Sequence, residues 1–590
     1  MKFPRIPALL LTLCLLLLPL VSCMDPAPAT ENTSEQTSGE EVTTGVAEEA
    51  VSEYVIVRHH TVSTELRALA TSLRNLLKNA TAATVTLTTD DAAYAPAEKK
   101  VYILLGNTDY DLSVKAVAAN ESGKITYRAE NNAVAIYAAN DALITIGLEK
   151  FLSDCLVGGV LLPASAYAER QVAAADCLRE GWGFSFPAYN SGTLDPAVYS
   201  AGYALSQNTD QSQMMVVNDT TAEEFRNYVS RLADFGYKAE FENEIDGNLF
   251  ASCRSPLGTN VYAYYIRDIH KARVIHDVSS PSLAEFCYSV APSENTTFYM
   301  YKMAEGSGSE DTFLVHVADN SWIVFDGGVT QYGETDPDGL FTDGLYEFMR
   351  SRSNLAEGEK LTISCWFNSH PHRDHFLAMT SLVTKYHAQI DLQRVLANAP
   401  DTAVVANSNY PQYRDCVSAI ERYYPKILWL KAHTGMKIQI ADVSFEVLSS
   451  QEDMIENWSA AVKSLPAKVY DINNSSLICK VDVAGLTVLE LGDAFRCNYL
   501  LETHYQPATV ACDILKVAHH YYNPDSDDYY QSLYATGKIQ YALVNSLANG
   551  KSSTLATQLG NRFINADAAH VYGFRKLANG GIALEVIAAD

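Results

Sequence analysis

Residues 51–178 alternate between two hydrophobic patterns. Short apolar runs predict strands, and apolar residues that recur every three or four positions between the first two runs predict an amphipathic helix. This alternation predicts a small α/β domain over 51–178. The predicted strands are 54–57, 85–89, 101–105 and 133–138, and the apolar face of the helix consists of Leu66, Leu69, Leu73, Leu76 and Leu77.

The pattern changes over 182–295. The box Thr221-x-x-Glu224 is typical of a helix N-terminus, and the apolar positions after it continue until Gly236, which is typical of a helix end. Asp246-Gly247 separates two strand-like runs and predicts a hairpin. We therefore expect an α+β domain, with strands at 238–245, 248–253, 262–266 and 274–278.

The first 23 residues contain Lys2, Arg5, an apolar run over 6–21 and Cys23. That run is shorter than the ~20 residues that span a bilayer, which favours an export signal over a transmembrane anchor. Its end resembles a bacterial lipobox, in which Cys23 would be lipidated. Residues 24–50 are acidic and poor in large apolar side chains, which predicts a disordered tether. We expect a lipid-anchored, extracytoplasmic protein of the cell membrane.

The net charge and the cysteine content limit the partners and the disulfide bonds that we expect. The chain has 70 acidic and 43 basic residues, and its formal net charge of −27 makes nucleic acid an unlikely partner because phosphates are bound by Lys and Arg. Of its 11 cysteines, nine follow the signal, an odd number without CxxC spacing. We expect buried apolar cysteines and no disulfide framework.

One sequence motif consists of residue types that bind metal ions. His370-Pro371-His372-Arg373-Asp374-His375 follows a predicted strand at 361–367. Two histidines one residue apart can bind one divalent ion, and Asp374 with His375 can turn toward a second. Imidazole and carboxylate ligands suit one or two Zn²⁺ ions, with Mn²⁺ or Fe as alternatives. Such ions activate water, which predicts a hydrolase.

With these residues, 296–590 resembles the metallo-β-lactamase superfamily. A predicted strand ends in Asp326-Gly327-Gly328, another ends in Gly492-Asp493, and a third ends in His519-His520. The resemblance implies an αββα sandwich in a multidomain α/β and α+β chain. It further implies that Asp326 braces the metal loop, that Asp493 bridges two metals, and that Asp374 or Asp493 orients the water or moves its proton.

The resemblance leaves the ligand set open at two places. Strand alternation favours His519 as the ligand of the second metal, with His520 facing the substrate, or acting as the ligand in the other register. For the third ligand of the first metal, His387 and His433 are poorly placed and Asn398 is the candidate. His570 corresponds to a histidine that faces the substrate in some members.

The substrate class also comes from the resemblance. Asn473-Asn474-Ser475-Ser476 is similar to the subgroup of the competence DNA-channel hydrolase domain and choline-phosphate esterases, which implies a phosphodiester. Here Tyr521-Tyr522 replaces the usual Gly-Ser, and the tyrosines would reshape the pocket mouth. We expect a zinc-dependent, phosphodiesterase-like enzyme acting on a small-molecule or cell-surface substrate. β-Lactam hydrolysis would not require the upstream domains.

The upstream residues support one alternative function. Residues 101–111 and 133–152 resemble the accessory α/β domain of several glycoside hydrolases, which usually carries no catalysis. The alternative is therefore a surface lipoprotein that binds a glycan or a partner and retains a degenerate hydrolase domain.

Overall fold

In the computed structural model, residues 50–590 form one compact unit. Cys23 and the predicted signal and tether lie outside the described residues. No helix in the described part is long and apolar enough to cross a membrane. The described residues are 51–162, 165–173, 179, 184–195, 212–301, 311–328, 340–400, 410–455, 472–522, 526–545, 550–565 and 570–588.

The first sheet has the strand order β2-β1-β3-β5-β4-β8, and its first four strands in this order are parallel. The four predicted strands are confirmed, and the predicted leucine face of α1 packs against them. Its strands are β1 (Glu53–Arg58), β2 (Thr84–Thr89), β3 (Lys100–Leu105), β4 (Lys124–Glu130), β5 (Ala133–Tyr137) and β8 (Glu169–Ala173), with helices α1 (Thr64–Ala80), α2 (Asp111–Ala119) and α3 (Asp141–Cys155) and the small pair β6 (Leu156–Val157) and β7 (Val160–Leu161).

The middle sheet has the order β11-β12-β13-β14-β10-β9. Thr221 and Glu224 form the predicted capping box at the start of α4, and Gly236 ends the following turn with a left-handed φ of 84°. The predicted hairpin at Asp246-Gly247 is also confirmed. The elements are β9 (Thr193–Leu194), β10 (Gln213–Asn218), α4 (Ala222–Leu232), β11 (Lys238–Ile245), β12 (Asn248–Arg254), β13 (Asn260–Ile266), β14 (Lys271–Asp277) and α5 (Leu283–Phe286).

The central strands of the middle sheet are buried on both faces. Successive side chains of a strand point to opposite faces. Along β13, Val261 and Ala263 join the core that contains α4 and the first sheet, whereas Tyr262 and Tyr264 join the core of the C-terminal sheets. This explains why β13 is almost continuously apolar, whereas the edge strand β11 is polar and largely exposed.

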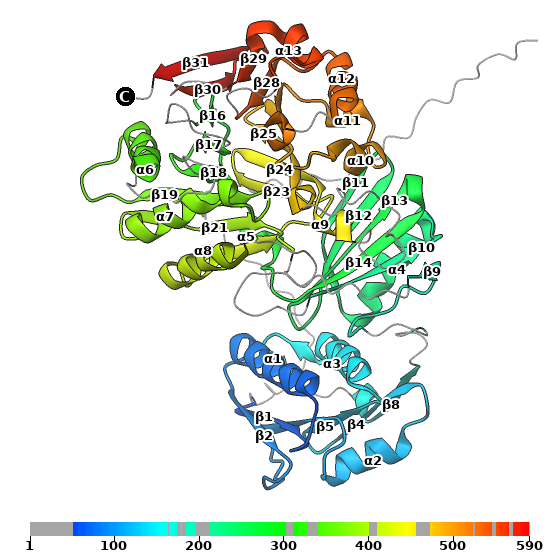
Figure 1. Ribbon diagram of the computed structural model, residues 1–590. Helices are drawn as coiled ribbons and strands as arrows, with labels where there is room; N and C mark the ends of the chain where they lie inside the picture. The colour runs from blue at the N-terminus through cyan, green and yellow to red at the C-terminus, as the bar shows by residue number, and fades with distance from the viewer. Residues whose placement is uncertain are drawn as a thin grey trace, which may run out of the picture. The chain divides into compact units, whose positions relative to one another are not determined.

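Two larger sheets contain the described strands from Tyr288 onward (Figure 1). One has the order β22-β21-β19-β18-β17-β16-β30-β31, with β20 paired to β19, and the other runs from β15 through β23 to β29. Their bounds are β15 (Tyr288–Ser289), β16 (Thr297–Met300), β17 (Thr312–His316), β18 (Trp322–Asp326), β19 (Leu361–Asn368), β20 (Ile390–Leu392), β21 (Arg394–Ala397), β22 (Leu428–Lys431), β23 (Lys437–Ala441), β24 (Val443–Ser449), β25 (Ile478–Val483), β26 (Leu486–Glu490), β27 (Ile514–Lys516), β28 (Tyr541–Val544), β29 (Phe563–Asn565), β30 (His570–Lys576) and β31 (Ile582–Ala588).

These two sheets pack face to face. Phe445 of one sheet lies 5.6 Å from Phe325 and 6.0 Å from Phe367 of the other, measured between ring centroids. The opposite face of the sheet with β19 packs against α6, α7 and α8, and the sheet with β27 shares its core with α10 to α13. The helices are α6 (Leu340–Ser353), α7 (Leu377–Tyr386), α8 (Tyr410–Tyr423), α9 (Gln451–Ile455), α10 (Cys497–Glu502), α11 (Pro507–Val510), α12 (Asp527–Ala535) and α13 (Thr554–Leu559).

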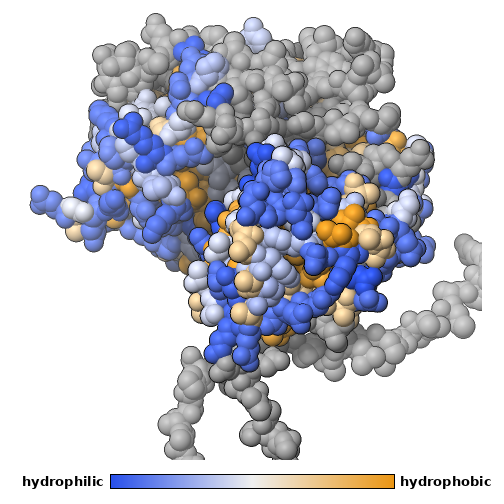
Figure 2. All heavy atoms as spheres, turned by 90° about the horizontal axis from the view of Figure 1, so that it is seen from below, coloured by the Kyte–Doolittle hydropathy of each residue, from blue (hydrophilic) through white to orange (hydrophobic). Residues whose placement is uncertain are grey.

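The protein is thus a mixed α/β molecule with several sheets. The cysteines in the described residues are free, and all but the half-buried Cys287 are buried, as predicted. The face seen in Figure 2 is mostly hydrophilic, with apolar positions scattered over it.

Candidate metal centre

The metal-loop motif follows β19, which lies between β18 and β21 and is parallel to both. After Asn368 the chain passes through His370 and His372 into the 3-10 turn Arg373–His375 and then into α7. Parallel strands present their following loops at the same edge of a sheet. The loop therefore lies beside Asp326, the last residue of β18.

Asp326 holds this loop in place. One carboxylate oxygen accepts the Ser369 backbone N–H at 2.7 Å and the Asn368 side-chain N–H at 3.2 Å. The other lies 2.7 Å from the Ser369 hydroxyl and 2.7 Å from Nδ1 of His375. This fixes the orientation of the His375 ring and leaves its Nε2 facing inward.

A first group of metal-ligating atoms comprises His370, His372 and Asp493, with one donor atom from each within 4.8 Å of the others. Nε2 of His370 lies 3.9 Å from Oδ2 of Asp493 and 3.1 Å from Oδ1 of Asn473. The amide nitrogen of Asn473 in turn lies 3.3 Å from Nε2 of His519. Asn473 therefore stands where a further ligand of this group would be.

A second group shares Asp493 with the first and adds Asp311, His375 and His520, all buried. Oδ2 of Asp493 lies 3.1 Å from Nε2 of His375 and 3.4 Å from Nε2 of His520. Asp374 approaches His520 to 3.4 Å. One carboxylate shared by two groups is the arrangement expected of a ligand that bridges two ions.

Gly492 allows Asp493 to reach this position. Its φ of 51° is left-handed, and a Cβ at this residue would lie 2.7 Å from Cβ of Ser476 and 3.1 Å from Cβ of Ser369. The Ser476 hydroxyl accepts the backbone N–H of Asp493 at 3.0 Å. The turn after β26 thus requires glycine for two reasons, its conformation and its close packing.

The chemistry of the buried atoms fits a metal. Nε2 of His375 and both ring nitrogens of His520 are buried and make no hydrogen bond, although carboxylate oxygens approach them to 3.1–3.6 Å. Buried polar groups without hydrogen bonds are costly, so several of them converging on one point indicate a missing ion. His370, His372, Asp493, Asp311, His375 and His520 would hold divalent ions, with Asp374 beside the second group.

The electrostatics of the group agree with this. Burial lowers the pKa of His520, but Asp493 and Asp311 outweigh it and raise the pKa to about 10. Burial likewise opposes the rise in the pKa of His375, which Asp493 and Asp326 lift well above its usual value. Without a metal, both rings hold protons, and binding an ion would displace them.

A buried lysine compensates the carboxylates from the other side. Nζ of Lys516 makes an ion pair with Asp311, donates to the Gly492 carbonyl at 2.6 Å and lies 3.7 Å from Oδ1 of Asp493. Burial opposes its charged form, yet Asp311, Glu490 and Asp493 raise the pKa of Lys516 above its usual value. Lys516 therefore stays charged beside Asp311 and Asp493.

The preference for His519 as the ligand of the second group requires correction. β27 ends at Lys516, and His519, His520 and Tyr521 all have positive φ values. Strand alternation therefore does not apply to the double histidine. The structure places His520 in the group, and His519 beside Asn473 with its ring half-buried.

The candidates for the third ligand of the first metal lie elsewhere. Asn398 donates to Glu452 at 2.9 Å and to the Ala432 carbonyl at 2.8 Å, so its amide is engaged outside the centre. His433 lies 3.0 Å from Glu452 through Nδ1 and 3.4 Å from Asp277 through Nε2. His387 stacks on Tyr423.

His433 belongs to a buried set of charges where the middle sheet meets the C-terminal sheets, which we call the junction network. Its members are Arg273, Asp277, Lys431, His433, Glu452 and Asp453, all buried.

The tyrosines after the double histidine divide between core and surface. Tyr521 is buried and donates its hydroxyl to Asp527. Tyr522 is 71% exposed, and its ring lies 5.6 Å from that of His519. Only Tyr522 therefore stands beside the residues of the centre. His570, at the start of β30, lies outside both groups.

Sequence analysis did not identify three residues of the centre as site residues: Asp311, Asn473 and Lys516. Asp311 directly precedes β17, whose first residue pairs with Asp326, so sheet pairing alone brings it to the centre. A single acidic residue before a strand gives no sequence signal. Lys516 lies on β27 itself, where a buried charge between apolar neighbours could have suggested a functional position.

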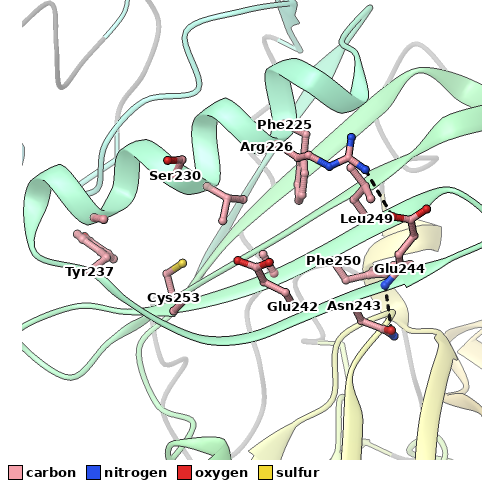
Figure 3. A pocket seen from close by; sticks show the side chains of 14 residues that line it. Phe225, Arg226, Ser230, Tyr237, Glu242, Asn243, Glu244, Leu249, Phe250 and Cys253 are labelled. Atoms are coloured by element: carbon pink, nitrogen blue, oxygen red, sulfur yellow. Dashed lines mark hydrogen bonds and ion pairs between the residues drawn. The ribbon is translucent and has the colours of Figure 1, made fainter. Parts of the chain in front are cut away.

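A separate cavity of about 640 Å³ lies between α4 and strands β11 and β12 (Figure 3). In Figure 3, Arg226 and Glu244 point toward one another, and their side chains form an ion pair of 3.4 Å. Cys253 and Tyr237 also line this cavity. Among the described residues, neither group of the metal centre contributes to it.

Comparisons with known proteins add little. No protein-family model and no curated protein match the chain. Two solved structures of CmlA match, a point mutant of the β-hydroxylase (10% identity, 43% of this chain and 46% of that chain, TM-score 0.22) and CmlA described as a diiron β-hydroxylase from Streptomyces venezuelae (11%, 43%, 45%, 0.21). The chain spans less than half of either, and TM-scores this low say nothing about its function.

Proposed function

We propose that this protein is a metal-dependent hydrolase whose C-terminal part is a sandwich of the metallo-β-lactamase type. The observation that carries the proposal is Asp493, which is shared by two buried groups of histidines and carboxylates. Two facing sheets with helices outside, and ligands in loops after β19, β26 and β27, support the fold assignment.

Zinc, manganese or iron suits this donor set, and two such ions would supply a water of lowered pKa and a positive charge for an electron-rich substrate. The chain's own residues orient these parts. Lys516 lies beside Asp493 between the two groups, and Asp326 fixes the ring of His375. Asp374, which is 8% exposed, is placed to accept a proton from the attacking water.

A phosphodiester is the substrate that we propose. Half-buried His519 and the Asn473 amide stand beside the first group and can donate to substrate oxygens, and Tyr522 offers an exposed ring for the leaving group. The net charge of −27 opposes a long nucleic acid, which favours a small or cell-surface diester.

The test is the metal content of the full chain together with its turnover of bis(p-nitrophenyl) phosphate. We expect the unmodified chain to bind close to two metals more than His372→Ala does, and metal-dependent hydrolysis to be absent from His372→Ala. His387→Ala is the matched control, because this half-buried histidine lies outside the centre. A folded protein that binds no metal and is not rescued by added metal would overturn the proposal in favour of a surface binding protein.

The location proposed for this activity is the outer face of a cell membrane, through a lipid on Cys23. The supporting features are the apolar run before Cys23 and the acidic residues after it. Incorporation of labelled palmitate that is lost in Cys23→Ala tests this part separately from the enzymatic activity.

A further inference from the structure

A second cluster of metal-ligating side chains lies at the carboxyl edge of the first sheet, in another part of the chain from the centre above. His59 and His60 directly follow β1, and Asp90 and Asp91 directly follow β2, its parallel neighbour. β3 pairs with the other side of β1. Ligands of open α/β sheets bind beyond the carboxyl ends of the strands, where neighbouring connections diverge.

Asp90 is the fixed point of this cluster. Its side chain is fully buried, Oδ1 accepts the His60 backbone N–H at 3.0 Å, and Oδ2 accepts the Asp109 backbone N–H at 3.1 Å. Burial opposes ionisation, but these hydrogen bonds and the histidines hold the pKa of Asp90 below its usual value. A charged carboxylate is thus held in one orientation by backbone groups from two loops.

The two imidazoles face this carboxylate. Nε2 of His59 lies 3.8 Å from Oδ2 of Asp90, and Nδ1 of His60 lies 3.3 Å from Oδ1 of Asp90 and 3.9 Å from Asp91. Nδ1 of His59 accepts the Thr61 backbone N–H at 3.1 Å and lies 2.8 Å from the Thr61 hydroxyl. These contacts fix the His59 ring with Nε2 toward Asp90.

The spacing suits a small coordination sphere. One donor atom from each of His59, His60 and Asp90 lies within 4.8 Å of the others. Tetrahedral ligands ~2.0–2.1 Å from an ion are about 3.3–3.4 Å apart. Nδ1 of His60 and Oδ1 of Asp90 are already at that separation, and Nε2 of His59 lies 3.8 Å from the other oxygen of the same carboxylate.

We propose that His59, His60 and Asp90, with Asp91 as the fourth ligand, bind one divalent transition-metal ion such as Zn²⁺ or Ni²⁺. Two neutral imidazoles and two carboxylates balance the charge of the ion, and this mixture of nitrogen and oxygen donors suits these metals. The His60 side chain is 45% exposed, so the site is open to solvent and exchanges its ion. The ion ties the loop after β1 to the loop after β2.

The experiment titrates Zn²⁺ into the full chain by competition with a chromophoric chelator and counts the bound metal per chain by elemental analysis. We expect His59→Ala/His60→Ala to bind one Zn²⁺ fewer than the unmodified chain and to keep its hydrolytic activity. His387→Ala, which removes a half-buried histidine outside both sites, should change neither value. An equal number of ions bound with equal affinity in the double variant would overturn the proposal.

A second measurement keeps the test valid if the double variant folds poorly. His60→Gln replaces a largely exposed ring, and circular dichroism without metal shows whether its fold is intact. Zn²⁺ should raise the melting temperature of the unmodified chain more than that of His60→Gln, because an ion that binds the native state stabilises it. Equal shifts in the two proteins would count against the site.

Discussion

The metal centre and the junction network are both buried clusters of histidines and carboxylates, but their hydrogen bonds differ. In the junction network both ring nitrogens of His433 face carboxylates, Glu452 at 3.0 Å and Asp277 at 3.4 Å, in hydrogen-bonding geometry. In the centre both ring nitrogens of His520 make no hydrogen bond. Composition alone therefore does not distinguish a structural ion-pair cluster from a candidate metal centre. A single unsatisfied ring nitrogen does not either, because Nε2 of His504 beside Asp453 also makes no hydrogen bond. The difference is that ring nitrogens of both His375 and His520 converge on Asp493.

The largest effect should come from Asp493→Ala, because this carboxylate serves both groups of the centre. We expect about two fewer ions per chain and no detectable hydrolysis, while the far-ultraviolet circular dichroism stays unchanged. Elemental analysis and the diester assay provide the measurement. Retention of two metals by this variant would remove Asp493 from its bridging role.

The opposite result is expected for the junction network. Glu452→Gln leaves buried His433 without its nearest carboxylate, and breaking a buried ion pair costs about 3–5 kcal/mol. The free energy of unfolding in urea should fall by that amount, with metal content unchanged. Glu585→Gln, in an exposed pair with Arg352, is the control and should cost under about 1 kcal/mol. Loss of metal in Glu452→Gln would contradict the distinction.

Glu149 is a buried carboxyl outside both clusters, and its partners are hydroxyl groups in place of histidines. Its effect on stability should therefore depend on pH. Burial raises the pKa of Glu149 from 4.5 to about 7, although Tyr237 and Ser255 donate to it. The native state therefore keeps a proton that the unfolded chain loses above about pH 4.5. The stability from this group is complete below that pH and is lost as the pH rises through about 7, by about 3 kcal/mol in total.

Urea unfolding at pH 5 and pH 8 measures this loss. Glu149→Gln cannot ionise, so its stability should fall less between the two values than that of the unmodified chain. The same fall in both proteins would mean that Glu149 is already charged in the native state.

The smallest effect is expected for Asp326→Asn, which changes a residue that braces a ligand without belonging to either group. Replacing such a residue typically lowers metal affinity by about 10–100-fold. Chelator competition measures the change. Asp319→Asn, which lies just before the other end of β18, is the control. An unchanged metal affinity in Asp326→Asn would mean that the contacts of Asp326 do not position the metal loop.

Sequence patterns predicted the elements whose cause is local. The capping box of α4, the hairpin at Asp246-Gly247 and the strand before the metal loop all follow from neighbouring residues. The preference for His519 failed because β27 ends early and three left-handed residues follow it. Asp311 and Asn473 reach the centre only through strand pairing and loop packing between distant parts of the chain, which no local pattern records.

The central strands of the middle sheet have no face turned to solvent, and this sets the smallest piece of the chain that can fold. Gly435 of the C-terminal sheets packs so closely on Phe250 that a Cβ there would lie 1.9 Å from the ring, and Tyr262 donates to the Thr434 carbonyl at 2.9 Å. A protein that ends before Thr297 would expose this apolar surface and aggregate. Heating should therefore unfold residues 50–590 in one cooperative transition, and no proteolytic cut should release an active C-terminal fragment.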